Sequence, residues 1–488
     1  MRAFKTVVVC VLALLAGLAA GRPAACGIGA QLVAVDYVYS VVPGDPPRLF
    51  VELDIYGLPP GNDHLLIPRQ FGSASDIPAL FRGLAAFDSR GRPLELSFDP
   101  AYTPDYLGLS FSAWRVAVPE DGRLTVKADI VDDLRPGHAY GWIVQNHLQK
   151  DWAQWGATCS LVLVESAVKQ GRIGRFRFEV PPGWDVLCSA TQKDGWYVYD
   201  IWSVAFLGDY SLAREFREGD VLLKAYVNPP LRAVAYPRME DSCRALVRTL
   251  AHAVKVYGGP PDPGQKPPLT ITAVFQADGR LNEPKFQGGV ASTNNVFLAF
   301  TNMFEDLSEY TVHEGLHFYN EHAFSGVPVA PSGTEIEVIW VQEGFNEYTT
   351  FKWQRDAGVI SGEEFWRIMR AKQETYLKSP WRRTRSLPQA AADYTSEASF
   401  DIIYAKGALV ALLFDERIRE LTKGRRSGDD VLRLLYQRFN RYQGKPPYTS
   451  ADVLAIMREL TGTDLTPEYE RWVLGTGDLD LSKFPKLR

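Results

Sequence analysis

The sequence predicts a multidomain chain in which an antiparallel β domain is followed by a mostly helical α+β domain. In VELDI (residues 51–55) and RFRFEV (175–180) every second side chain is apolar, which is typical of antiparallel strands with one buried face. Turns that contain Pro and Gly separate such runs from about residue 30 to 227, as in a β-sandwich. The strand pattern ends at Asn228-Pro229-Pro230, where we expect a domain boundary.

Helices dominate the expected second domain, with a few strands among them. Residues 239–257 have a helical pattern that ends before a Gly-Gly-Pro-Pro sequence. LTITAVF (269–275) and NVFLAF (295–300) are typical of strands. Ser361 and Glu364 have the spacing of a capping box, which predicts the start of a further helix.

Length and composition limit the classes of function. A chain of 488 residues predicts two or three domains, and 46% hydrophobic residues suffice for a large core. The net charge of -5 is small, and no clustered basic patch points to nucleic acid. We therefore expect no nucleic-acid partner, and the oligomeric state stays open.

The N-terminus has the pattern of a signal peptide. Arg2 and Lys5 precede an apolar run from residue 7 to 20, and small residues follow at the expected cleavage site. We divide the chain into a signal peptide (1–21), an N-terminal β-sandwich domain (28–230) and a second domain (231–488). The expected location is outside the cytoplasm, in the bacterial periplasm or cell envelope.

The cysteines leave two questions open. A disulfide between Cys159 and Cys188 is plausible in an oxidising compartment, although pairing cannot be determined from sequence. Cys26 could carry a lipid anchor, but Pro23 stands where that signal has an aliphatic residue. A lipid at Cys26 is the membrane attachment that we consider.

The clearest chemical signal is HEGLH, residues 313–317. On a helix, residues four apart share a face, so His313 and His317 can bind one metal ion. Neutral imidazoles suit zinc, and Glu314 is placed to take a proton from a water molecule that zinc activates. The alternative is a surface helix with two unrelated histidines.

A catalytic zinc ion needs a third protein ligand. A third histidine six residues after the second would be one solution, but Ala323 stands there, and His322 should face elsewhere. Glu343, on the next predicted helix, is the better candidate. Glu347, one turn later, could accept the second N–H of a ligand histidine, or it could be an ordinary exposed glutamate. Glu335 and Glu337 are further acidic candidates nearby.

Three motifs in order resemble the glycyl aminopeptidase-like family of zinc peptidases. They are HEGLH, WVQEGFNEY (340–348) and FDIIYAKGALVALLFDERIRE (400–420). The family belongs to the gluzincins, with aminopeptidase N as a more distant relative. The resemblance implies a β domain followed by a thermolysin-like catalytic domain that binds one zinc ion.

The resemblance also assigns individual roles. It implies His313, His317 and Glu343 as zinc ligands and Glu314 as the general base. Tyr404 would donate a hydrogen bond to the tetrahedral intermediate of peptide hydrolysis, a role that a phenol can fill. Gly407, just after it, would permit close packing of helices.

The sequence departs from the family in its glycine-rich stretch. Gly288 and Gly289 are present, and with Val290 they are our candidates for substrate binding by an edge strand. The glutamate that follows the glycines in aminopeptidases, where it binds the substrate's amino group, is absent. A simple turn without substrate contact is the alternative for this stretch. We also expect no PDZ domain, because the chain ends soon after the catalytic helices.

Two functional hypotheses follow. The first is an exported zinc metallopeptidase that acts on peptides, either as an aminopeptidase or as an endopeptidase. The second is a zinc-bearing binding or scaffold protein of the cell envelope that has the same fold but no activity. A site with three protein ligands and an adjacent base favours the first.

Overall fold

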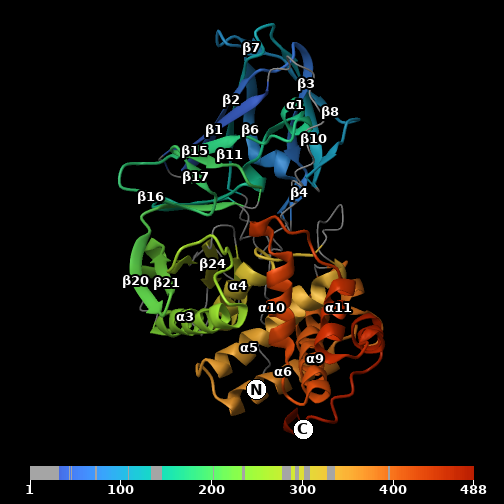
Figure 1. Cartoon of the computed structure of the whole chain (residues 1–488). Coiled ribbons are helices and arrows are strands. Elements are labelled where there is room, and N and C mark those ends of the chain that lie inside the picture. The colour runs from blue at the N-terminus through green and yellow to red at the C-terminus, as the bar shows by residue number, and fades with distance from the viewer. Residues whose placement is uncertain are drawn as a thin grey trace.

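The computed structural model has a strand-rich first half and a helical second half, as predicted (Figure 1). Two hydrophobic cores correspond to these halves. The predicted signal peptide and Cys26 lie outside the described residues. The structure describes residues 32–42, 44, 47–71, 74–107, 109–132, 146–201, 203–232, 237–276, 287–291, 296–301, 308–326, 336–393 and 396–487.

Three sheets of four or more strands make up most of the first half. Val51, Leu53 and Ile55 of the VELDI strand are buried in its core, as their alternation predicted. The largest sheet has the order β17-β18-β15-β1-β2-β11-β6-β7, the next has β14-β3-β10-β8 with β9 beside β10, and the third has β12-β13-β19-β16. The strands are β1 (Ala34–Val42), β2 (Arg48–Tyr56), β3 (Gly61–Pro68), β6 (Phe81–Phe87), β7 (Pro93–Leu94), β8 (Leu96–Asp99), β9 (Asp105–Tyr106), β10 (Leu109–Val118), β11 (Leu124–Ile130), β12 (His147–Leu148), β13 (Trp152–Gly156), β14 (Leu163–Val164), β15 (Arg175–Glu179), β16 (Asp185–Cys188), β17 (Gln192–Lys193), β18 (Trp196–Val198) and β19 (Val204–Gly208).

Two expectations for this half need correction. The sheets are not purely antiparallel, because β1 pairs in parallel with β15. The long chain between these strands allows such a crossover. The expected disulfide between Cys159 and Cys188 is also wrong, since neither sulfur takes part in a disulfide bond. Cys188 lies on β16, and its sulfur accepts a hydrogen bond from the backbone N–H of Ala190.

The second half contains a five-stranded sheet of order β20-β21-β22-β24-β23. Strands β21, β22 and β24 are parallel to one another, and β23 pairs antiparallel with β24 at one edge. The predicted strands at 269–275 and 295–300 correspond to β22 and β24. The strands are β20 (Ser211–Glu218), β21 (Val221–Val227), β22 (Leu269–Gln276), β23 (Gln287–Ala291) and β24 (Val296–Thr301).

The strand pairing and core of the second half begin before the expected boundary at 230. Strand β21 pairs along its whole length with β22, and Val221, Leu223 and Ala225 are buried in the second core. Tyr210, in contrast, belongs to the first core. Hydrogen bonding and packing therefore change between β19 and β20, because the apolar face of β21 is covered by later elements of the chain.

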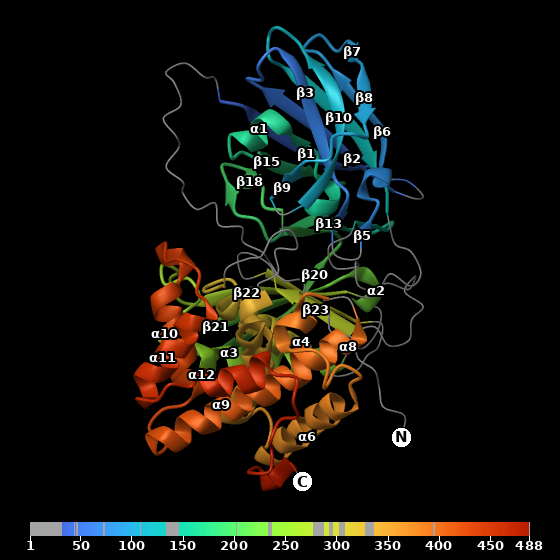
Figure 2. The ribbon, with the colours of Figure 1, turned by 90° about the vertical axis from the view of Figure 1, so that its right-hand side faces the viewer.

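Helices cover this sheet and extend away from it (Figure 2). Helix α3 contains the predicted helix at 239–257 and packs against α4 and α5. Ser361 caps α6, where its side chain accepts the backbone N–H of Glu364 at 3.0 Å. No helix in the described part of the chain is both long and apolar enough to cross a bilayer. The main helices are α3 (Pro237–Tyr257), α4 (Ser308–Asn320), α5 (Asn346–Asp356), α6 (Gly362–Lys378), α9 (Gly407–Thr422), α10 (Gly428–Phe439) and α11 (Ser450–Thr461).

Two of the three π-helical segments in the described part of the helical half contribute to the site. They are η6 (Trp340–Phe345), directly before α5, and η7 (Asp401–Lys406), directly before α9. Segments of this type add a residue to a helical turn and occur often at functional sites. Each of them carries one residue of the site described next.

Candidate metal centre and active site

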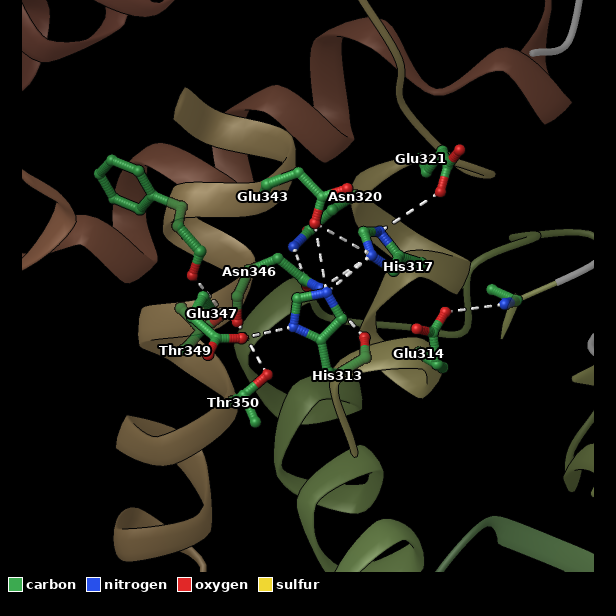
Figure 3. Close-up of polar contacts among 12 residues, drawn as sticks. His313, Glu314, His317, Asn320, Glu321, Glu343, Asn346, Glu347, Thr349 and Thr350 are labelled. Carbon is green, nitrogen blue, oxygen red and sulfur yellow. Dashed lines mark hydrogen bonds and ion pairs between the residues drawn. The ribbon is translucent and has the colours of Figure 1, made fainter. Parts of the chain in front are cut away.

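The two histidines of HEGLH lie on one face of α4, as the helical repeat requires. Both are buried, each with 1% of its surface exposed. Their Nε2 atoms point toward each other and are 3.1 Å apart (Figure 3). A helix that buries two imidazoles is unlike the surface helix that the alternative hypothesis required.

Glu343 completes the cluster from the π-helical segment η6. Its Oε2 lies 3.2 Å from His313 Nε2 and 3.6 Å from His317 Nε2. One potential ligand atom from each of the three residues lies within 4.8 Å of the others, and all three residues are buried. The structure thus brings together the three residues that the sequence suggested as metal ligands.

The donor set fits a metal ion. Two neutral imidazoles facing each other can place at most one N–H between their nitrogens, so several lone pairs converge on one point. A cation removes this repulsion. Two imidazole nitrogens and one carboxylate oxygen are ligands that zinc accepts, and three protein ligands leave a coordination position for substrate.

The local charges also favour a cation. Burial lowers the pKa of His313, but hydrogen bonds with Glu343 and Glu347 outweigh burial and raise it well above its ordinary value. Burial raises the pKa of Glu343, yet the nearby His317 charge and the bond with His313 bring it down to about 2. The carboxylate is therefore ionised and stabilises positive charge between itself and the imidazoles.

A second layer of side chains holds the ligands. His313 Nδ1 lies 2.7 Å from Glu347 Oε2, and His317 Nδ1 lies 3.3 Å from Glu321 Oε2. Asn346 donates its amide N–H to the backbone oxygen of His313 at 3.0 Å. Such contacts fix the ring orientation of ligand histidines. The structure thus places Glu347 where sequence analysis suggested, whereas Glu321 and Asn346 were missed.

Glu314 lies beside the ligand cluster and contacts the edge strand β23. Its Oε2 accepts the backbone N–H of Ala291 at 2.9 Å (Figure 3). Gly288, Gly289 and Val290 belong to the same strand and pair with β24. The glycine-rich stretch is therefore a strand at the edge of the sheet rather than a simple turn, and Glu314 is hydrogen-bonded to that strand.

Tyr404 approaches the centre from the π-helical segment η7. Its ring centroid lies 5.7 Å from that of His313, and the side chain is only 6% exposed. The predicted close packing at Gly407 is also present. A Cβ added to Gly407 would lie 2.8 Å from Gly344 Cα, so the two backbones touch. The contact joins the segment that carries Tyr404 to the segment that carries Glu343.

Other candidates lie outside the cluster. Glu337 accepts the backbone N–H of Ser450, the first residue of α11, at 2.9 Å. Glu335 is not among the described residues. His322 is buried, and burial lowers its pKa to about 3, so it is neutral. It is not part of the three-residue group, in keeping with the expectation that it faces elsewhere.

A cavity of about 660 Å³ lies elsewhere, between α5, α6, α9 and the C-terminal segment. Tyr348, Trp366, Asp415 and Lys486 are among the residues that line it, and none of the predicted site residues does. The Asp415 carboxylate there accepts hydrogen bonds from Tyr348 and from the backbone N–H of Gly428. We attribute no chemistry to this cavity, because its buried acid is already used within the protein.

Comparison by sequence gives no relatives. No protein-family profile matches the chain, and no curated protein matches it.

Comparison with solved structures gives clear matches over nearly the whole chain. An aminopeptidase N family protein from Idiomarina loihiensis matches with a TM-score of 0.73 and 15% identity, over 92% of this chain and 77% of that one. An M1 zinc metallopeptidase from Deinococcus radiodurans matches with a TM-score of 0.51 and 15% identity, over 93% of this chain and 95% of that one.

A further structure of the Deinococcus enzyme is a mutant with a bound Tyr-Ser-Ala substrate. It matches with a TM-score of 0.50 and 15% identity, over 92% of this chain and 96% of that one. At such identities the likeness shows the fold alone. The strand-rich half, the helical half and their order agree with these structures, and the chain therefore has the fold of the aminopeptidase N-like zinc metallopeptidases.

Proposed function

We propose that this protein is a zinc-dependent metallopeptidase with one zinc ion per chain, bound by His313, His317 and Glu343. The observation that carries the proposal is the convergence of these three ligands beside Glu314, which in turn touches an edge strand. The two halves then act as the β-sandwich and thermolysin-like catalytic domains that the sequence resemblance implies. Export through the segment 1–21 is part of the proposal.

The mechanism follows from the positions of the side chains. Zinc, when bound, polarises the scissile carbonyl and lowers the pKa of a water molecule. The backbone N–H of Ala291 orients the Glu314 carboxylate, which takes a proton from the attacking water and passes it to the leaving amine. The edge strand β23 binds the peptide in extended form through its backbone.

Tyr404 donates its phenolic O–H to the oxygen that becomes negative during the reaction. A Tyr404→Phe variant should keep its fold and its zinc but lose about 10²–10³-fold in kcat, the typical effect of removing one such donor. Tyr436→Phe is a suitable control, because its hydroxyl bonds to the Pro260 carbonyl, away from His313. An unchanged rate in Tyr404→Phe would remove Tyr404 from the mechanism.

The proposal leaves two alternatives for the substrate, a peptide with a free amino terminus or one without. Ala291 lies in the stretch where aminopeptidases have the glutamate that binds the amino group of the substrate. Its methyl side chain supplies no carboxylate, and its backbone N–H is bonded to Glu314. An ammonium group in a closed site needs a partner charge. Either another acid has this role, or the enzyme accepts peptides without a free amino terminus.

One experiment tests both activity and substrate end. A peptide mixture, half with free and half with acetylated N-termini, is digested by the wild type and by Glu314→Gln, and the products are identified by mass spectrometry. We expect cleavage by the wild type and a loss of about 10²–10⁴-fold in the variant. Trimming of free N-termini alone identifies an aminopeptidase, whereas internal cuts in blocked peptides identify an endopeptidase.

Two outcomes would contradict the proposal. Equal rates in both proteins would show that Glu314 is not the base. Absence of cleavage by zinc-loaded wild type on a diverse mixture would favour the alternative, a zinc-bearing binding or scaffold protein of the cell envelope.

A further inference from the structure

A row of three charged side chains extends from the metal centre to the protein surface. Glu347 contacts His313 Nδ1 with its Oε2 at 2.7 Å, and its Oε1 forms an ion pair with Lys372 Nζ. Lys372 also pairs with Glu309 Oε1 at 3.0 Å. The side chains become more exposed along the row, from 3% for Glu347 to 18% for Lys372 and 40% for Glu309.

Lys372 comes from an element that supplies no other part of the described site. It lies on α6, whereas Glu347 lies on α5 and the histidines on α4. Its Nζ also lies 5.4 Å from the centroid of the Phe351 ring, a distance at which a cation and an aromatic face attract each other. The ammonium group is thus held in place from two sides.

A buried carboxylate needs a counter-charge or several hydrogen bonds, because removing it from water is costly. Glu347 has one oxygen on His313 and the other on Lys372. Without Lys372, a buried Glu347 would turn or recruit water, and its contact with His313 would weaken. His313 can present Nε2 to a metal ion only while its Nδ1 side stays fixed.

We propose that Lys372 is a positioning residue of the metal centre. It holds Glu347, Glu347 holds the His313 ring, and the packing of α6 therefore contributes to zinc affinity. The inference rests on the proposed zinc site, and it adds a residue on a separate helix that no sequence motif indicated.

The test compares two lysines that each form ion pairs with two carboxylates. Lys372→Met removes the ion pair with Glu347. Lys352→Met removes a similar ion pair on α5, where Lys352 Nζ lies 2.5 Å from Asp429 Oδ2 and the side chain is 2% exposed. The control thus loses a buried charge on the helix that carries Glu347. Lys352 pairs with Asp429 and Asp356, whereas Lys372 pairs with Glu347, which contacts the ligand His313.

The measurement is the zinc dissociation constant of the full chain, by competition with a chromogenic chelator after zinc removal and refilling. We expect about 10–100-fold weaker zinc binding in Lys372→Met, the range typical of lost outer contacts to ligand histidines. Lys352→Met should change zinc affinity by less than about threefold and lower only the melting temperature. Lys372→Arg keeps the charge and should restore most of the affinity.

Wild-type zinc affinity in Lys372→Met would overturn the inference, as would an equal loss in Lys352→Met. If Lys372→Met does not fold, Lys372→Gln gives the same readout with a milder change. Failure of the proposed function is distinguishable: if wild type binds zinc but cleaves no peptide, the peptidase proposal fails while the affinity comparison still decides the role of Lys372.

Discussion

Substituting Glu343 by alanine should abolish tight zinc binding and with it hydrolysis. Glu343 supplies the one carboxylate of the ligand group, and its Oε2 lies within 3.6 Å of both ligand nitrogens. Two histidines alone seldom hold zinc tightly, because metal affinity depends on ligand number and charge. The loss of zinc affinity should exceed the roughly 10–100-fold effect of removing a hydrogen-bond partner of a ligand histidine. The zinc content of the dialysed Glu343→Ala protein, measured by atomic emission, tests this prediction.

Two further variants, at increasing distance from the metal centre, serve as controls for the Glu343→Ala result. Glu347→Gln keeps the shape of the side chain beside His313 and should weaken zinc binding by about 10–100-fold without abolishing it. Glu309→Gln changes the exposed end of the charged row and should have little effect. Circular dichroism shows whether each variant remains folded. Full retention of zinc by a folded Glu343→Ala protein would show that the third ligand lies elsewhere in the chain.

The histidine pair of the proposed zinc site could be predicted because its geometry is local. His313 and His317 meet through the helical repeat alone, whereas Glu343 was suggested by the need for a third ligand and by the resemblance. The same repeat also joins Glu321 to His317, four residues apart, so Glu321 could have been found by the rule that found the histidine pair. The contact between Glu314 and the Ala291 N–H involves the backbone, and side-chain patterns carry no information about it.

Features that depend on packing between distant segments could not be predicted. Lys372 reaches Glu347 only because α6 packs against α5, and no motif encodes that contact. Strand β21 looked like the last strand of the first domain because it ends at Asn228-Pro229-Pro230, yet its partner is β22. Alternation predicts that a strand has a buried face, but it does not say which later segment covers that face. The disulfide between Cys159 and Cys188 was wrong for a similar reason, since the distance between two thiols is set by the arrangement of the sheets.

Replacing Gly407 by alanine should destabilise the protein, although the same change inside a helix usually stabilises it by up to about 1 kcal/mol. Gly407 is the first residue of α9 and directly follows the segment that carries Tyr404. The added methyl group would lie 2.8 Å from Gly344 Cα, a backbone atom that cannot rotate away. We expect a loss of about 1–3 kcal/mol in the free energy of unfolding, the usual effect of overpacking, measured by chemical denaturation.

The larger effect should be on catalysis, because this glycine contact sets the positions of two site residues. Glu343 directly precedes Gly344, and Tyr404 lies three residues before Gly407. A shift of about 1 Å in a catalytic group can cost on the order of 10²-fold in rate, so kcat should fall by more than the stability loss alone explains. Gly362→Ala is the matched control, since a Cβ at that position meets no atom within 4 Å and α6 begins there; it should leave both stability and kcat close to the wild type. A Gly407→Ala protein as active as Gly362→Ala would show that the crossing of the two backbones does not position Tyr404 and Glu343.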